Sequence, residues 1–234
     1  MNTVITMAGA GRRLVGDSNL IKPLYPILGK PMIEHVVKDL NIEGTYIFIV
    51  QKAHRQEWKL DELLNRIAPN CKIIEVDGLT EGQASSALLA KEFIDNEQPL
   101  LTANCDQILN WDSNAFLEDI KSNNADGCIP VIKANNPSMS FAEINQYGYI
   151  SRTAEKQVIS NWGTVGLYYW SKGKDFVRCA NKMISDGNKV NNEYYICPVY
   201  NYAIKEGLKI IPFELHEMWA LGNPQEVDSY IQSL

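Results

Sequence analysis

The sequence predicts an α/β fold class with a three-layer, mostly parallel sheet, and three observations support this prediction. Apolar runs rich in β-forming residues alternate with amphipathic segments throughout the first half of the chain. Several of these runs are apolar at successive positions, as in strands that are covered on both faces. The second half carries shorter strand-like runs separated by polar turns. We therefore expect a Rossmann-like sheet with a small antiparallel extension.

The elements of the first half follow in order along the chain. The opening strand leads into a glycine-containing loop, and a helix follows in which Ile33, Val36, Val37 and Leu40 recur at helical spacing. The helices are expected at 31–40, 54–67 and 82–94, and the later strands at 45–50, 72–76 and 100–104.

The sequence pattern of the second half predicts an antiparallel region and two helices. Its expected strands are 127–132, 147–150, 165–170 and 208–213, and its expected helices are 171–186 and 193–206. No linker, repeat or low-complexity tract separates the halves. We therefore expect a single domain over 1–234.

Composition and charge limit the function classes. The chain has 234 residues, of which 45% are hydrophobic and 21% charged, as in an ordinary globular protein. Its net charge of −6 argues against a nucleic-acid or anionic-membrane surface, which would need a basic face. Five scattered cysteines favour a reduced, cytoplasmic compartment. No apolar run approaches the about 18–20 residues of a membrane span.

The loop after the first strand predicts an anion-binding site. Gly9 and Gly11 allow the backbone to approach a phosphate, and cations follow at Arg12, Arg13 and Lys22. Leu14 stands where a dinucleotide-binding G-x-G-x-x-G fingerprint needs its third glycine. No G-x-x-x-x-G-K-[ST] loop is present either, so the sequence disfavours hydride transfer and P-loop chemistry.

Three polar features follow predicted strands and should therefore meet at one edge of the sheet. They are the loop containing Gly9 and Gly11, the turn Glu81–Gln83, and Asp106. Their coincidence is stronger support for a ligand site than any one of the motifs alone.

A specific family resemblance rests on the first 32 residues. Ala8-Gly9-Ala10-Gly11-Arg12-Arg13, Lys22-Pro23-Leu24 and Gly29-Lys30-Pro31 resemble the G-x-G-x-R, K-P-L and G-K-P signature of the sugar-nucleotide nucleotidyltransferases, or sugar-phosphate pyrophosphorylases. This resemblance implies transfer of a nucleotidyl group from a nucleoside triphosphate to a phosphorylated acceptor, with Mg²⁺ as cofactor and release of pyrophosphate. It also implies a nucleotide-binding half at about 1–125 and an acceptor-binding half at about 126–234.

The resemblance assigns roles to the nucleotide side. Arg13 and Lys22 are the expected catalytic cations, and Asp106 is the expected metal ligand and third catalytic residue. Gln83 can both donate and accept hydrogen bonds, which suits a pyrimidine edge. The full set expected to bind nucleotide is Ala8, Gly9, Ala10, Gly11, Arg12, Glu81, Gly82, Gln83 and Asn104.

The resemblance also assigns an acceptor side in the second half. Glu155 is expected to bond acceptor hydroxyls and Lys156 to bind the acceptor phosphate. Gly148 and Glu193 complete the expected acceptor set, whereas Tyr194 and Tyr195 are expected in the core.

One departure concerns the second metal ligand of the family. Many members have an aspartate shortly after a tryptophan, but here Ala220 follows Trp219. The metal would then be held by Asp106 with phosphates and water, or by Asp106 with Glu193 or Glu217.

Several alternatives stay open at the level of sequence. Ala220 also suits a nucleotide-sugar-binding sensor or regulatory protein with weakened catalysis. A glycosyltransferase is disfavoured because Asn104-Cys105-Asp106 lacks the D-x-D motif. The nucleobase, the oligomeric state and the acceptor are not identified. A cytidylyltransferase acting on a non-sugar phosphate, such as phosphocholine or a phosphorylated amino acid derivative, stays among the candidates.

Overall fold

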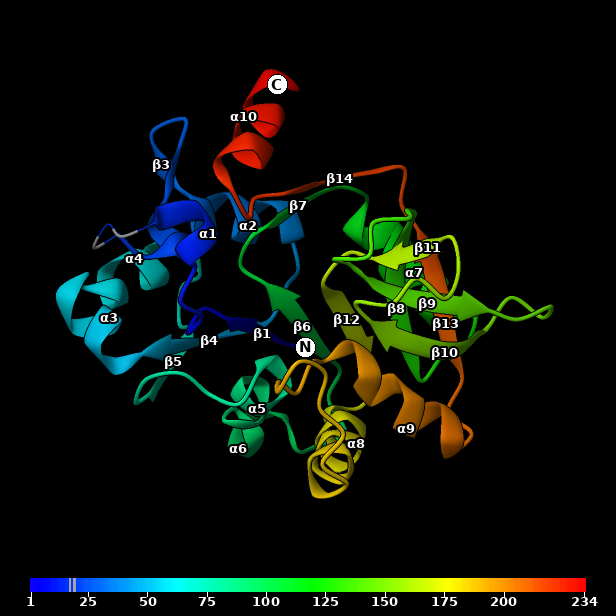
Figure 1. Cartoon of the computed structure of the whole chain (residues 1–234). Coiled ribbons are helices and arrows are strands. Elements are labelled where there is room, and N and C mark those ends of the chain that lie inside the picture. The colour runs from blue at the N-terminus through cyan, green and yellow to red at the C-terminus, as the bar shows by residue number, and fades with distance from the viewer. Residues whose placement is uncertain (17, 19) are drawn as a thin grey trace.

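A computed structural model describes residues 1–16, 18 and 20–234. Within these residues the largest sheet has ten strands, in the order β10-β9-β11-β8-β12-β6-β1-β4-β5, with β13 added on β8 (Figure 1). Its parallel part consists of β1 (Asn2–Thr6), β4 (Thr45–Gln51), β5 (Lys72–Val76) and β6 (Leu100–Asn104).

Side chains of the parallel strands alternate between two apolar cores, one on each face of the sheet. In β4, Ile47 and Ile49 belong to one core, whereas Phe48 and Val50 belong to the other. This alternation follows from the two-residue period of a strand. It explains why the sequence is apolar at successive positions, and it confirms the three-layer α/β fold class.

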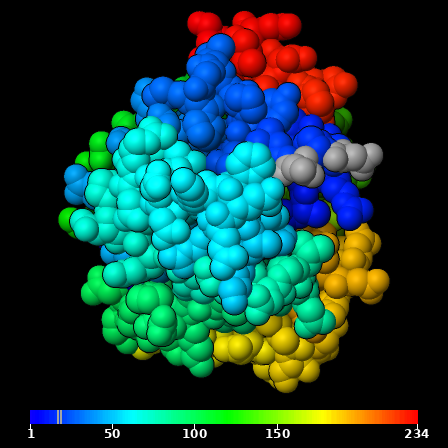
Figure 2. All heavy atoms as spheres, turned by 90° about the vertical axis from the view of Figure 1, so that its left-hand side faces the viewer, coloured from blue at the N-terminus to red at the C-terminus, as the bar shows by residue number. Residues whose placement is uncertain are grey.

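Helices cover both cores (Figure 1). One face carries α1 (Arg12–Val15), α2 (Met32–Leu40), α4 (Leu60–Ile67), α7 (Ser113–Ser122) and α10 (Pro224–Gln232). The other carries α5 (Gln83–Leu88), α6 (Lys91–Ile94), α8 (Gly173–Ser185) and α9 (Tyr200–Lys205). In Figure 2 the C-terminal segment (red) lies above the first forty residues (blue). This arrangement agrees with the edge-on contact between Tyr230 of α10 and His35 of α2.

Two predicted helices are each divided in the structure. The helix expected at 54–67 is α3 (Lys52–Glu57) followed by α4, because Lys59 adopts a left-handed conformation with φ 46°. The helix expected at 82–94 is α5 followed by α6, joined by i to i−3 backbone bonds of Leu89 and Ala90. The helix expected at 193–206 begins four residues later than expected, as η2 (Cys197–Val199) followed by α9.

The antiparallel strands continue the parallel sheet, because β12 pairs with β6. They are β8 (Gly127–Lys133), β9 (Ser140–Ile144), β10 (Ile150–Glu155), β11 (Trp162–Thr164) and β12 (Leu167–Trp170), and β13 (Ile210–Glu214) joins β8 in parallel. The strand expected at 147–150 is wrong. Residues 147–149 lie in the β9–β10 turn, and Ile150 is the first residue of β10. In this turn the Asn145 side chain accepts hydrogen bonds from the backbone N–H groups of Tyr147 and Tyr149.

Short elements complete the chain. They are η1 (Lys22–Leu24), the hairpin β2 (Pro26–Ile27) and β3 (Lys30–Pro31), and the antiparallel pair β7 (Gln107–Asn110) and β14 (Glu217–Ala220). In the described parts of the chain, no helix has both the length and the apolar character needed to cross a bilayer.

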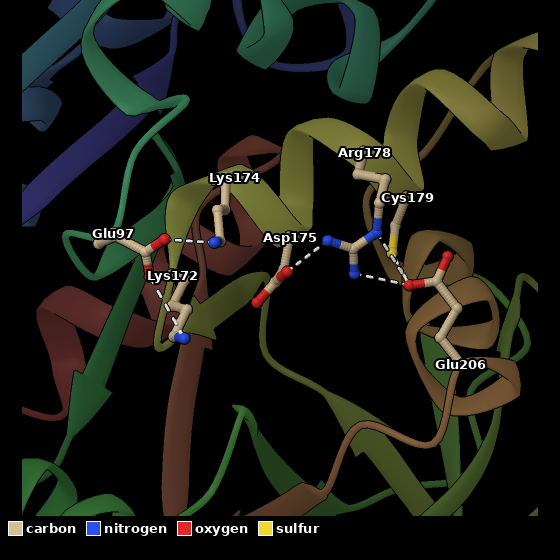
Figure 3. A network of polar contacts seen from close by, with 7 residues as sticks. All are labelled: Glu97, Lys172, Lys174, Asp175, Arg178, Cys179 and Glu206. Carbon is tan, nitrogen blue, oxygen red and sulfur yellow. Dashed lines mark hydrogen bonds and ion pairs between the residues drawn. The ribbon is translucent and has the colours of Figure 1, made fainter.

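An exposed charge network ties α8 to its neighbours (Figure 3). Glu97 pairs with Lys172 and Lys174, and Arg178 lies between Asp175 and Glu206. Exposed pairs of this kind contribute about 0–1 kcal/mol each, and none of these residues lines the cleft described below.

Asp39 of α2 holds β7 in place. Its Oδ2 accepts a hydrogen bond of 2.8 Å from the Leu109 N–H, and its carbonyl accepts one from Trp111 Nε1 at 3.0 Å. Burial raises the pKa of Asp39 to about 6, although the Leu109 N–H partly offsets that effect.

Asp39 should give the folding stability a measurable pH dependence. Its pKa is higher in the folded than in the unfolded state, so its stabilising contribution is present below about pH 4 and is lost as pH rises through about 6. In Asp39→Asn, which keeps the acceptor for Leu109, the Asp39 contribution of about 1–3 kcal/mol to the loss of stability between pH 4 and pH 8 should disappear. Urea unfolding at both pH values measures this. The exposed Asp77→Asn is the control, and the same pH dependence in wild type and Asp39→Asn would contradict the account.

Candidate active site

A cleft of about 950 Å³ opens at the carboxyl ends of β1 and β6. The loop after β1, the turn before α5 and the end of β6 form one wall, and residues of β9, β10 and 193–195 form the other. The three polar features that the sequence placed at one sheet edge therefore do meet there. Parallel α/β sheets bind ligands at this edge.

The glycine loop is held against β4 and η1. Met7 N donates to the Ile49 carbonyl at 2.8 Å, and Gln51 Nε2 donates to the Ala8 carbonyl at 2.7 Å. Gly11 has φ 63°, and a Cβ there would lie 2.5 Å from Lys22 Cβ. The absence of a side chain at Gly11 thus lets Lys22 lie directly beside the loop. Ala8, Gly9, Ala10, Arg12 and Arg13 line the same wall.

Lys22 forms an ion pair with Asp106 across 84 positions of sequence. The two side chains are only 12% and 22% exposed, so the pair is partly withdrawn from solvent. Asp106 lies two residues after the end of β6, which is next to β1 in the sheet. The strand order therefore brings the expected catalytic lysine and the expected metal ligand into direct contact.

The turn before α5 presents Gln83 to the cleft. Gln83 Nε2 donates to Asn104 Oδ1 and lies 3.5 Å from Thr6 Oγ1. Gly82 has φ 126°, and a Cβ there would come within 2.5 Å of the Tyr194 backbone nitrogen. Gly82 thus lets the segment around Tyr194 pack against the turn.

Glu81 is not among the cleft-lining residues, contrary to its expected place in the nucleotide set. Its carboxylate is 66% exposed and pairs with Lys189 at 2.6 Å. Because the Glu81 carbonyl accepts from Tyr194 N at 2.8 Å, the backbone of Glu81 still helps to fix the turn.

The second wall contains Glu155, Lys156 and Glu193. Glu155 accepts a hydrogen bond from Ser140 Oγ, and burial raises the pKa of its carboxyl group. Lys156 Nζ contacts the Tyr195 hydroxyl. Tyr195 lines the cleft, so its expected place in the core is wrong, whereas Tyr194 is buried as expected.

The structure does not bring Gly148 to the cleft. It lies in the β9–β10 turn, and nothing is within 4 Å of the position a Cβ would take. The cleft is instead lined by the start of β9, including Ser140. Asn145 and Gly148 bracket a four-residue turn, and this turn signal could have identified the hairpin from sequence.

The segment containing Ala220 runs beside Asp106. Leu221 N donates to the Asp106 carbonyl at 2.8 Å, and Ala220 pairs with Gln107 and lines the cleft. A methyl group therefore occupies the position where the resemblance predicted a carboxylate. Glu217 lies at the other end of β14, opposite Asn110, and does not line the cleft.

Glu226 of α10 lines the cleft and was missed in the sequence. A Cβ on Gly222 would lie 3.0 Å from Glu226 Oε2 and 3.8 Å from both Arg13 Nη2 and Lys22 Nζ, so three charged groups surround this point. Asn223 caps α10 by accepting from Glu226 N, and Glu226 Oε2 accepts from Gly222 N at 2.7 Å. This reciprocal capping pattern was visible in the sequence, but it carried no functional signal.

The carboxylates of the cleft suit a metal that relies on substrate for its other ligands. Among the described residues, no group of three or more His, Cys, Asp or Glu side chains is placed to hold a metal ion. Mg²⁺ typically uses one or two carboxylates together with phosphate oxygens and water. Asp106, at the end of β6 and facing the glycine loop, fits that chemistry.

The fold and the site are those of a class of α/β proteins with a cation-lined cleft at the carboxyl ends of parallel strands. The sequence model of the nucleotidyl transferase family matches residues 2–219. The chain therefore belongs to the nucleotidyl transferase family.

Individual relatives agree with this assignment. The bifunctional protein GlmU of Methanocaldococcus jannaschii is 32% identical over 232 residues, which cover 97% of this chain and 52% of that protein. The chain thus spans about half the length of this curated relative.

Solved structures share the fold. A nucleoside-diphosphate-sugar pyrophosphorylase from Vibrio cholerae RC9 has a TM-score of 0.82 at 22% identity, covering 99% of this chain and 100% of that one. The inositol-1-phosphate CTP transferase from T. maritima has a TM-score of 0.74 at 15% identity, covering 99% and 96%.

Gly11→Ala should disrupt the cleft by displacing Lys22. It combines a left-handed conformation, costing about 1–2 kcal/mol, with a clash costing about 1–3 kcal/mol more. Gly187→Ala is a matched control, because Gly187 has φ 65° and open space around it. Chemical unfolding should show a larger loss of stability for Gly11→Ala. Equal losses would contradict the close packing of Gly11 on Lys22.

Proposed function

We propose that this chain transfers a nucleotidyl group from a nucleoside triphosphate to a phosphorylated small molecule, with release of pyrophosphate. The acceptor class that we propose is the sugar 1-phosphates and similar polyol phosphates. The supporting observation is that one cleft has Arg13, Lys22 and Asp106 on one wall and Glu155 and Lys156 on the other. Two anionic substrates bound to these walls would meet between them.

The proposed chemistry is an in-line displacement at the α-phosphorus. An oxygen of the acceptor phosphate forms the new bond to phosphorus, and the bond to the bridging oxygen of the leaving pyrophosphate breaks. Lys22 and Arg13 stabilise the negative charge that develops on the α-phosphate and the pyrophosphate. No general base is required, because the acceptor phosphate is already an anion.

Mg²⁺ is the proposed cofactor, and Asp106 would hold it. When bound, the metal would neutralise charge on the triphosphate and orient it for attack. In the structure Asp106 also orients Lys22 through their ion pair, so one carboxylate would contact both the lysine and the metal.

The nucleobase that we favour is a pyrimidine. Gln83 Nε2 already donates to Asn104, which leaves Gln83 Oε1 free of protein hydrogen bonds among the described residues. This oxygen can accept from the exocyclic amine of cytosine or from the ring N–H of uracil or thymine. The contact does not choose among these bases.

The second wall suits a polyol. Hydroxyl, amide and carboxylate groups gather there, and they are the usual partners of several sugar hydroxyls. The residues are Asn136, Ser138, Ser140, Glu155 and Glu193. Two structural neighbours, a nucleoside-diphosphate-sugar pyrophosphorylase and an inositol-1-phosphate CTP transferase, point in the same direction.

A second candidate is a nucleotide-sugar-binding sensor with weakened catalysis, which the methyl group of Ala220 beside Asp106 favours. Pyrophosphate release with Mg²⁺, measured over a panel of nucleoside triphosphates and phosphorylated acceptors, separates the candidates. The panel includes sugar 1-phosphates, inositol 1-phosphate and phosphocholine. Nucleotide binding without turnover on any acceptor would favour the sensor.

Lys22→Ala tests the catalytic wall. It should lower turnover about 100-fold or more, because it removes a preorganised cation from the developing charge. Lys30→Ala is the control, since Lys30 is 58% exposed and pairs with Glu34. Circular dichroism checks that both variants fold. Turnover near that of wild type in Lys22→Ala would contradict the role of Lys22.

A further inference from the structure

The side chain of Tyr195 contacts Lys156 through its hydroxyl. This contact with Lys156 Nζ places the nitrogen beyond the edge of the ring, 4.4 Å from the ring centroid. Both residues line the cleft. An exposed lysine has four rotatable bonds and normally samples many rotamers, so a hydrogen bond from its ammonium to a phenol restrains it.

The backbone of Lys156 also aims the side chain. Lys156 follows β10 and adopts φ 52°, a conformation that costs a residue with a side chain about 1–3 kcal/mol. Its N–H donates to the Met139 carbonyl at 3.1 Å. Strain of this kind persists where surrounding contacts enforce it, and here it directs the ammonium towards Tyr195.

Tyr195 is itself held by the strap, which we define as residues 189–196. Val190 and Glu193 exchange two backbone hydrogen bonds of 3.0 Å around Asn191 and Asn192, whose φ angles are 48° and 64°. Two central residues with positive φ are typical of a tight type I′ hairpin turn. The strap therefore begins with a well-defined turn.

The strap is also fixed to the nucleotide wall. Tyr194 N donates to the Glu81 carbonyl, and Ala84 N donates to the Tyr194 carbonyl, both at 2.8 Å. Lys189 pairs with Glu81, and Ile196 is fully buried. The Tyr195 hydroxyl is therefore a fixed point between the two walls.

A neutral partner suits a phosphate-binding lysine better than a carboxylate does. A phenol is uncharged near neutral pH, so Tyr195 sets no negative charge against the ammonium. As the acceptor of one ammonium N–H, it leaves the other two N–H groups for a ligand. A carboxylate in its place would compete with the phosphate for that charge.

We propose that Tyr195 is a positioning residue that holds the Lys156 ammonium where the phosphate monoester of the acceptor binds. This inference rests on the proposed function and adds to it a residue without which the acceptor binds weakly. Tyr195 acts through Lys156, so its effect should fall on the acceptor and not on the nucleoside triphosphate.

Tyr195→Phe is the direct test, because it keeps the ring and removes the hydroxyl. We expect the KM for the acceptor to rise about tenfold, as for loss of a hydrogen bond to a charged group, with the KM for the nucleoside triphosphate changed less than about twofold. Tyr147→Phe is the matched control, since Tyr147 is 72% exposed on the β9–β10 turn. An unchanged acceptor KM, or an equal rise of both KM values, would overturn the proposal.

A second readout does not depend on turnover. Acetylation of lysines by an N-hydroxysuccinimide ester, mapped by mass spectrometry, should modify Lys156 several-fold faster in Tyr195→Phe than in wild type. Lys30 should react equally in both proteins. An unchanged rate at Lys156 would overturn the proposed restraint even in an active enzyme.

The same labelling separates failure of this inference from failure of the proposed function. If no acceptor in the panel supports turnover, glucose 1-phosphate and inorganic phosphate are used as binding probes. Protection of Lys156 by either probe in wild type, weakened in Tyr195→Phe, would support the positioning role without catalysis. Absence of protection in wild type, or equal protection in both proteins, would overturn it.

Discussion

The contact between Lys22 and Asp106 sets the geometry of the nucleotide wall. It joins the segment after the glycine loop to the end of β6, and it exists because β1 and β6 are neighbours in the sheet. A partly buried ion pair contributes little net stability, since desolvation offsets its Coulomb attraction. Its main effect is to fix a flexible lysine beside Gly11. Loss of either partner would leave the other charge uncompensated in the cleft.

The two cleft lysines have different kinds of partner. Lys22 pairs with a carboxylate, whereas Lys156 rests on a neutral phenol. The chain as a whole carries a charge of −6, so anionic substrates must be attracted by local cations rather than by the overall field. On the nucleotide wall, Arg12 and Arg13 add to Lys22 and outweigh Asp106. On the acceptor wall, which also holds Glu155 and Glu193, Lys156 is the cation that can attract a phosphate.

Local patterns in the sequence were sufficient to predict the parallel half of the fold. They were insufficient to predict contacts between residues far apart in the chain. The run 45–50 predicted β4 because a strand covered on both faces is apolar at every position. The pairing of β7 with β14 joins two four-residue strands more than a hundred positions apart, and neither strand has a pattern of its own. In the site, the glycine loop and Asp106 could be predicted to lie together, because both follow strands of the parallel sheet. Tyr195 was misplaced because an aromatic residue beside a buried one predicts core.

The chain after residue 189 returns twice to the nucleotide wall. The strap pairs with the turn 81–84, and β14 brings Ala220 beside Asp106, with Glu226 following on α10. Residues 1–125 therefore do not build the nucleotide wall alone. Tyr194 binds the turn next to Gln83 on the nucleotide wall, and Tyr195 holds Lys156 on the acceptor wall. Two consecutive residues therefore contact the proposed binding groups for both substrates. A shift of the strap must move both supports, so the backbone of residues 194 and 195 sets the distance between the two ligand sites.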